Sequence, residues 1–228
     1  MGSHQLVGKT LPFEEASRVP LLIRVPGQRN ARTIARPVSQ VDLMPTLLEL
    51  LLGKQFRACD FSNLDGSSLA PLLLASSTEA GAGEEQQQQT ERDVFMQWLF
   101  PRRTIIARVA WSPNSTDEPS TTAAASSLAG VLVDGKERKQ SDARIWKLTC
   151  SARLSEFELY DLSNDPRETD NLALEPRLAA AGKVSSGENA HGEHVVNRKY
   201  VELLRLLCAR IRSWQERVGD KCEIAEIS

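Results

Sequence analysis

The chain has 228 residues, 41% of them hydrophobic, which is enough to bury a core in one domain and a small second one. The 28 basic and 30 acidic residues are well mixed and give a formal net charge of −2, which excludes the basic surface of a nucleic-acid-binding protein. The longest apolar runs fall well short of the ~20 residues that a membrane span requires, so we expect no membrane span.

The first segment combines a histidine and a lysine, His4 and Lys9, with an apolar run between two prolines, residues 20–26. A lysine ammonium binds a sulfate or phosphate oxygen as a point charge, and an imidazole donates to an anion or to a leaving group. The run at 20–26 is typical of a strand buried on both faces. The pattern predicts an anion pocket beside a core strand; the alternative is that both side chains are solvated surface groups.

Two helices are predicted next. Residues 39–53 begin at a possible cap, Ser39 or Asp42, and end at Gly53, which can take a left-handed conformation. Apolar residues cover more than one face of this helix, so we expect it to pack between other elements. Residues 64–75 read as a turn followed by a short capped helix.

Four segments with strand-like patterns follow, and short links between them favour an antiparallel meander, whose last two strands alternate as half-buried strands do. They are residues 93–100, 104–111, 145–149 and 157–162. Asp165 lies in the turn sequence after the last strand, and turn formation accounts for it. The four tryptophans are expected in the core or on sheet faces rather than on a binding platform.

The last predicted element is a helix over residues 200–218, with Asn197 as its cap. Its apolar positions recur at steps of 4, 3, 4, 3 and 4 and form one face: Tyr200, Leu204, Leu207, Ile211, Trp214 and Val218.

The four cysteines contain no C-x-x-C pair, so a zinc site is not expected. Their even number permits disulfides without requiring them. Cys208 is interpreted as a small apolar residue that packs in the final helix. A disulfide between Cys208 and Cys222, across the end of that helix, is an alternative.

Four groups of motifs, taken in this order, resemble the formylglycine-dependent sulfatases of the alkaline-phosphatase superfamily. The first group contains three motifs: G-x-H-x-L-x-x-K, F-E-E and R-V-P-L-L-I-R-V-P-G. The third group is the motif L-D-G-S-S-L-A-P-L-L. The four groups lie at residues 2–27, 37–50, 64–73 and 146–173.

The resemblance implies an α/β fold: the C-terminal fragment of an alkaline-phosphatase-like sulfatase fold, with a small antiparallel sheet and a C-terminal helix. The implied division is residues 1–75 as the C-terminal portion of the catalytic domain, 76–92 as a low-complexity linker, and 93–228 as the small-sheet subdomain. Residues 112–128 and 179–196 are expected to be disordered insertions.

The resemblance also implies hydrolysis of sulfate esters of a small molecule or glycan, with calcium and formylglycine. Lys9 matches the lysine that contacts the sulfate, and His4 matches a pocket residue that contacts substrate or helps the leaving group. Glu14, Glu15 and Arg18 are interpreted as structural or rim groups. Family members are secretory, lysosomal or extracellular, but the sequence itself does not fix a compartment.

Two family features are missing from the sequence: the C-x-P-x-R nucleophile motif and the aspartates that bind calcium. Neither Cys150 nor Cys208 lies in the nucleophile motif, and the family's last calcium ligands normally lie just before G-x-H. We therefore expect this chain to bind no calcium and to be inactive alone. The alternatives are a non-catalytic sulfatase-like module, and a phosphodiesterase or phosphoryl transferase of the same superfamily.

Overall fold

The computed structural model describes residues 4, 11–28, 31, 33–61, 63–74, 92–98, 102–111, 143–151, 156–174, 196–224 and 227. They fall into two compact units. Unit 1 comprises Met1–Pro20, Phe95–Thr122 and Arg138–Ser228, and unit 2 comprises Leu21–Val94 and Ala123–Glu137. The linker at 76–92 and the insertions at 112–128 and 179–196 lie almost wholly outside the described residues.

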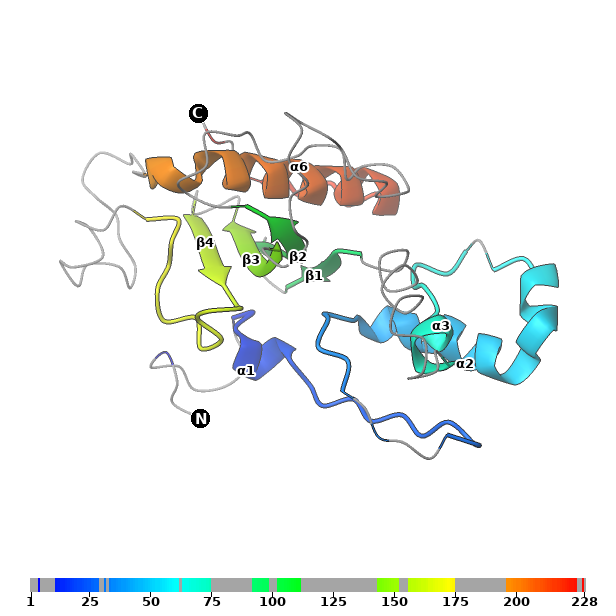
Figure 1. Ribbon diagram of the computed structural model, residues 1–228. Coiled ribbons are helices and arrows are strands. Elements are labelled where there is room, and N and C mark those ends of the chain that lie inside the picture. Colours follow the sequence, from blue (N-terminus) through cyan, green and yellow to red (C-terminus); the bar gives the residue numbers. More distant parts are fainter. Residues whose placement is uncertain are drawn as a thin grey trace, which may run out of the picture. The chain divides into compact units, whose positions relative to one another are not determined.

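Unit 1 is built on a four-stranded sheet in the order β1-β2-β3-β4 (Figure 1). The strands are β1 (Val94–Gln97), β2 (Arg102–Ala110), β3 (Ala143–Ser151) and β4 (Glu156–Asp161). β2 pairs antiparallel with β3, and β3 pairs antiparallel with β4. The predicted meander is therefore confirmed.

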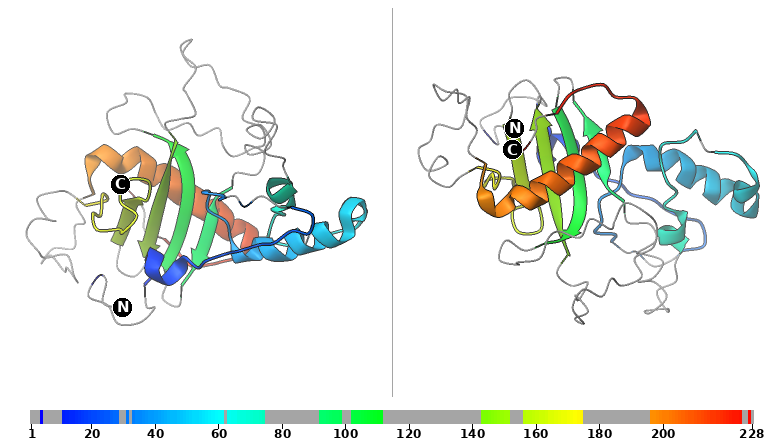
Figure 2. Two further views of the ribbon diagram at one scale, coloured as in Figure 1. Left: turned by 60° about the horizontal axis from the view of Figure 1, so that its bottom comes forward. Right: turned by 90° about the horizontal axis from the view of Figure 1, so that it is seen from above.

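The helix α6 (Val201–Val218) covers one face of this sheet, and the short helix α1 (Glu14–Ser17) lies on the opposite face (Figures 1 and 2). The core lies under α6, where alternate strand residues such as Trp146, Leu148 and Leu159 meet Leu204 and Leu207.

The sequence predicted half-buried strands, which is wrong for β3, because its residues 146–151 are buried on both faces. Polar side chains take the second face. Thr104 and Thr149 are paired across the strands, with their hydroxyl oxygens 2.9 Å apart, and Lys147 lies opposite Tyr160. The segment around α1 helps to remove this polar face from water, so its charged groups need partners.

The predicted capping role of Asn197 is confirmed in the turn that leads into α6. The Asn197 side chain accepts a hydrogen bond from the Lys199 amide in the 3-10 turn Arg198–Tyr200 that leads into the helix. The helix ends at Gly219, whose φ of 69° lies in the left-handed region that favours glycine.

Unit 2 contains the two predicted helices, α2 (Leu43–Leu52) and α3 (Ala70–Leu74). Ser39 and Asp42 form a reciprocal capping box at the 3-10 turn before α2, so both proposed cap residues take part. The turn before α3 requires Gly66, because a Cβ there would lie 1.9 Å from the carbonyl oxygen of Val41.

Two expectations for unit 2 are wrong in this structure. Residues 20–26 form no strand, and Leu22 is 96% exposed, because no described segment offers its backbone a pairing partner. The helix α2 does not pack between elements: Pro45 and Thr46 are buried, while Met44 and Leu51 are exposed.

None of the helices in the described ranges is both long enough and apolar enough to cross a membrane. The structure also contradicts a Cys208–Cys222 disulfide. The Cys208 sulfur lies 3.7 Å from that of Cys150 in the core, and all four cysteines are free. Cys208 does pack as a small buried residue, as its place on the helix predicted.

Candidate functional site

Of the two predicted pocket residues, the structure describes His4, while Lys9 lies outside the described residues. The His4 imidazole stacks on Phe13, with ring centroids 3.9 Å apart and ring planes within 3°. Its Nε2 atom lies 3.7 Å from Oε2 of Glu15. The imidazole therefore lies against the N-terminal end of α1, beside an acidic side chain.

Next to this end of α1 the structure buries a cation that the sequence analysis did not single out. Lys147 of β3 is 1% exposed, and its Nζ lies 2.8 Å from Oε1 of Glu168 and 3.0 Å from Oε1 of Glu14. The Ser17 hydroxyl is 3.5 Å away. Two carboxylates therefore compensate one buried ammonium, which a desolvated charge requires.

Glu168 reaches Lys147 from the turn that follows β4. Asp165 shapes this turn by accepting hydrogen bonds from the amides of Thr169 and Asp170, at 2.7 and 2.9 Å. Glu168 has a φ of 55° and is buried, and its Oε2 accepts the Glu14 amide at 2.5 Å. The turn and α1 are thus joined through one carboxylate.

Burial raises the pKa of the Glu168 carboxyl above its usual range, while Lys147 acts to lower it. Burial also raises the pKa of the neighbouring Tyr160 phenol, and the acidic residues Glu158 and Glu168 raise it further. Tyr160 therefore remains protonated at neutral pH. We call Glu14, Lys147 and Glu168 the buried ion cluster.

Glu14 belongs to this cluster, which agrees with its interpretation as a structural group. Glu15 and Arg18 are exposed. Asp161, at the end of β4, accepts hydrogen bonds from Ser163 and Asn164 and pairs with Arg144. Its carboxylate is therefore engaged by neighbouring structural groups. The two other histidines of the chain, His191 and His194, lie outside the described residues.

Three potential metal ligands come together here: His4, Glu15 and Glu168 place one ligand atom each within 4.8 Å of one another. Calcium prefers six to eight oxygen ligands. This set includes a nitrogen, and both oxygens of Glu168 are already engaged by Lys147 and by the Glu14 amide. These three residues therefore do not fit calcium.

The cysteines do not fit formylglycine formation either. Cys59 and Cys222 are followed by D-F-S-N and E-I-A-E, neither of which matches C-x-P-x-R. Cys150 and Cys208 are buried between β3 and α6. The described residues near α1 hold charges that are paired with one another, and none of the four cysteines of the chain lies in a C-x-P-x-R motif.

The sequence analysis missed Lys147 and Glu168 as a pair, although both lie within the motif at residues 146–173. One feature pointed to Lys147, because a lysine between Trp146 and Leu148 interrupts a strand whose neighbours are apolar. Such a lysine lies either on an edge strand of the sheet, where it reaches water, or inside the protein, where an acidic group pairs with it. Its partners lie 133 and 21 positions away in the chain, which no local pattern reveals.

Comparison with known proteins gives related sequences, although no family model matches the chain. The chain is 31% identical over 182 residues to the multifunctional alkaline phosphatase superfamily protein PehA of Trinickia caryophylli, covering 79% of the chain and 29% of that protein. It is 27% identical over 165 residues to a sulfatase of Formosa agariphila, covering 72% of the chain and 24% of the relative.

A shorter match is closer in identity. The chain is 41% identical over 71 residues to arylsulfatase K of Gallus gallus, which covers 31% of the chain and 12% of that protein. The chain spans less than a third of the length of each of these three relatives. It is therefore a relative of the sulfatases of the alkaline-phosphatase superfamily, as its motifs predicted, and it matches a part of their length.

Proposed function

We propose that this chain supplies the C-terminal part of a sulfuric ester hydrolase and that its first segment forms one side of the sulfate pocket. The observation that carries the proposal is the sequence relation to sulfatases, together with the G-x-H-x-L-x-x-K order that contains His4 and Lys9. The substrate class is a sulfated small molecule or glycan, and the parent reaction uses formylglycine and calcium.

In this proposal Lys9 places a positive charge against the non-bridging oxygens of the sulfate group, where negative charge must be stabilised as the ester bond breaks. His4 donates a proton or a hydrogen bond toward the ester or its leaving group. The buried ion cluster holds α1 against the sheet, which supports the position of His4 through its contacts with Phe13 and Glu15.

By itself this chain is not expected to catalyse the reaction. It has no C-x-P-x-R cysteine, and the ligand cluster near α1 does not fit calcium. The nucleophile and the metal supply most of the rate in such a reaction, and one lysine contact does not replace them. The purified 228-residue chain is therefore expected to show no aryl sulfate hydrolysis.

A chimaera tests the proposal directly. The matched part of a sulfatase relative is replaced by this chain, so that the relative supplies the nucleophile and the calcium ligands. The chimaera is expected to hydrolyse an aryl sulfate, and Lys9→Ala to lower kcat about 100- to 1,000-fold, as expected when an oxyanion contact is removed.

The matched control is Lys54→Ala, which removes an exposed lysine of unit 2 and is expected to leave kcat unchanged. Equal rates for the two variants would contradict the role of Lys9. A chimaera that is folded but inactive would favour the non-catalytic module, for which the closed core of unit 1 is the supporting observation.

A phosphoester is the second candidate substrate. PehA, whose match covers 79% of this chain, is named as a multifunctional protein of the alkaline phosphatase superfamily. Assaying the chimaera with aryl phosphate and aryl phosphodiester alongside aryl sulfate separates these activities. Faster turnover of a phosphate ester, with the same dependence on Lys9, would replace the sulfatase proposal.

A further inference from the structure

Two thiols meet in the core of unit 1, away from the segment that contains His4. Cys150 on β3 and Cys208 on α6 are 0% and 1% exposed, and their sulfur atoms are 3.7 Å apart. A disulfide has an S–S distance of about 2.05 Å, so the sulfurs need to approach by about 1.7 Å. The pair is 58 positions apart in the chain and joins the two main elements of the core.

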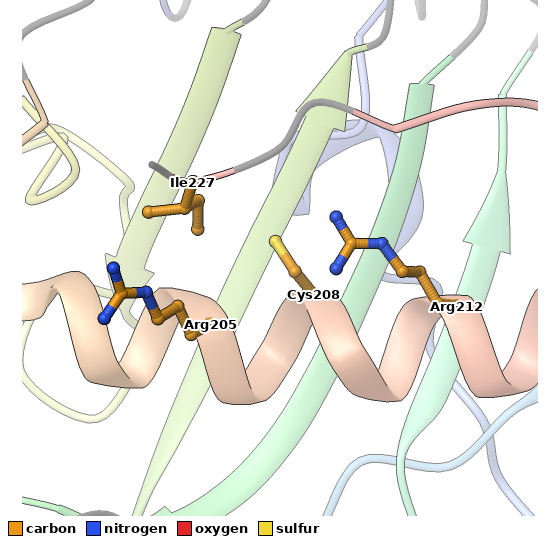
Figure 3. A pocket seen from close by; sticks show the side chains of 4 residues that line it. All are labelled: Arg205, Cys208, Arg212 and Ile227. Atoms are coloured by element: carbon orange, nitrogen blue, oxygen red, sulfur yellow. The ribbon is translucent and has the colours of Figure 1, made fainter.

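A small pocket leads to one of these thiols. It has a volume of about 150 Å³ and is lined by Arg205, Cys208, Arg212 and Ile227. Figure 3 shows the two arginines on either side of Cys208 along α6, with Ile227 across from them. Their positive charges favour an anionic reactant in this pocket. Arg205 also pairs with Glu202 at 2.8 Å on the helix surface.

We propose that Cys150 and Cys208 are a modification site, which an anionic low-molecular-weight disulfide of the glutathione class converts into a disulfide bond between β3 and α6. The proposal concerns the core of unit 1 and does not depend on the proposed hydrolase function.

The exchange proceeds in two balanced steps. The Cys208 thiolate attacks one sulfur of glutathione disulfide, which forms a mixed disulfide and releases one glutathione as its thiolate. Cys150 then loses its proton and attacks the Cys208 sulfur, which closes the protein disulfide and releases the second glutathione. The two protons from the protein thiols end on the two glutathione molecules.

The order of the two steps follows from the surroundings of each sulfur. Cys208 lines the pocket, whereas Cys150 lies behind it on the sheet. The hydrogen bond between the two thiols and the burial of Cys150 raise the pKa of Cys150, which lowers the fraction of reactive thiolate there. Cys208 is therefore the residue that reacts with the incoming disulfide.

The test uses the full chain with Cys59→Ser and Cys222→Ser, which removes the two cysteines outside the core. The protein is incubated with glutathione disulfide, denatured, alkylated and mapped by mass spectrometry. We expect a peptide pair linked through Cys150 and Cys208, and a Tm raised by about 5 to 10 °C that dithiothreitol reverses. Two alkylated thiols, or a mixed disulfide that never closes, would overturn the proposal.

Single variants in the same background test the order of reaction. Cys150→Ala is expected to retain one glutathione on Cys208, and Cys208→Ala to retain none on Cys150. Equal uptake by the two variants would refute the assigned order. Arg212→Gln is expected to slow the reaction with glutathione disulfide several-fold but not that with uncharged hydroxyethyl disulfide. If a single variant does not fold, the peptide map of the protein with Cys59→Ser and Cys222→Ser still decides whether the disulfide between Cys150 and Cys208 forms.

Discussion

Lys147 shows how a single residue links distant parts of this chain. Its ammonium is almost completely removed from water and lies between carboxylates from α1 and from the turn after β4. The attraction between these charges offsets the desolvation of Lys147 and Glu168 only while both partners are present. Removing either Lys147 or Glu168 therefore leaves the other as a buried charge without a counter-ion, which destabilises the fold.

Replacing Lys147 by methionine tests this dependence. Lys147→Met keeps most of the length of the side chain but leaves the buried Glu168 carboxylate without its ammonium. We expect a loss of about 3 to 5 kcal/mol in the free energy of unfolding, measured by denaturant titration. The matched control is Lys199→Met, at an exposed position, which is expected to change stability by less than about 0.5 kcal/mol.

The double variant Lys147→Met with Glu168→Gln separates lost charge compensation from lost packing. It removes the uncompensated charge together with its partner, so it is expected to recover part of the stability that Lys147→Met loses. An equal loss in Lys147→Met and Lys199→Met would mean that Lys147 is not held by its carboxylates.

The end of α6 is fixed to the sheet by one carboxylate. Asp220 follows the helix and binds the guanidinium of Arg103 on β2, with Nη2 and Oδ1 2.8 Å apart. It also accepts hydrogen bonds from the Gln215 amide group and the Cys222 backbone, at 3.1 and 3.2 Å. The hydrogen bond from Arg103 is the main reason why the pKa of Asp220 lies well below its usual range.

This lowered pKa predicts a pH dependence with a definite sign. Because Asp220 stays ionised in the folded state at lower pH than in the unfolded state, its contribution to stability is complete above about pH 4 and decreases as the pH falls further. Asp220→Asn is expected to cost about 3 kcal/mol at neutral pH, since it leaves the buried Arg103 without its counter-ion. The difference between wild type and variant should shrink below about pH 4.

Denaturant titrations of both proteins between about pH 7 and about pH 2.5 measure this difference. Asp170→Asn, at an exposed carboxylate of the same unit, serves as the control and is expected to change stability by less than about 0.5 kcal/mol. A difference between wild type and Asp220→Asn that stays constant over this range would show that the Asp220 charge does not stabilise the fold.

Local patterns in the sequence predicted the elements of unit 1 well. The alternation in β3 and β4 and the one-sided stripe of α6 are repeated over several residue pairs or turns, so neither depends on distant partners. The two-sided burial of β3 could not be predicted in this way. It depends on α1, which lies more than a hundred positions earlier in the chain and meets Lys147 in the folded protein.

The candidate site was less accessible to sequence reasoning than the fold. His4 and Lys9 were assigned through the resemblance to sulfatases, and the roles of both residues remain predictions. The pairing of Lys147 with Glu14 and Glu168 arises only when α1, β3 and the turn after β4 come together. Such pairing depends on long-range geometry that spacing along the chain does not encode.

The segment at residues 20–26 tests the view that the chain is one part of a larger fold. Among the described residues, none accepts a hydrogen bond from the amides of Leu21, Leu22 or Ile23, and Leu22 is 96% exposed. These amides are therefore expected to exchange with deuterium within seconds, whereas those of β3 are held in the sheet and exchange far more slowly.

Hydrogen exchange followed by mass spectrometry distinguishes the two settings of this segment. In the isolated chain, residues 21–25 are expected to exchange fast, with Phe157–Tyr160 of β4 as the protected internal reference. In the chimaera, the same amides are expected to become protected, because the retained part of the sulfatase relative offers strands that can pair with them. Fast exchange in an active chimaera would show that this apolar run is not the buried strand its sequence predicted.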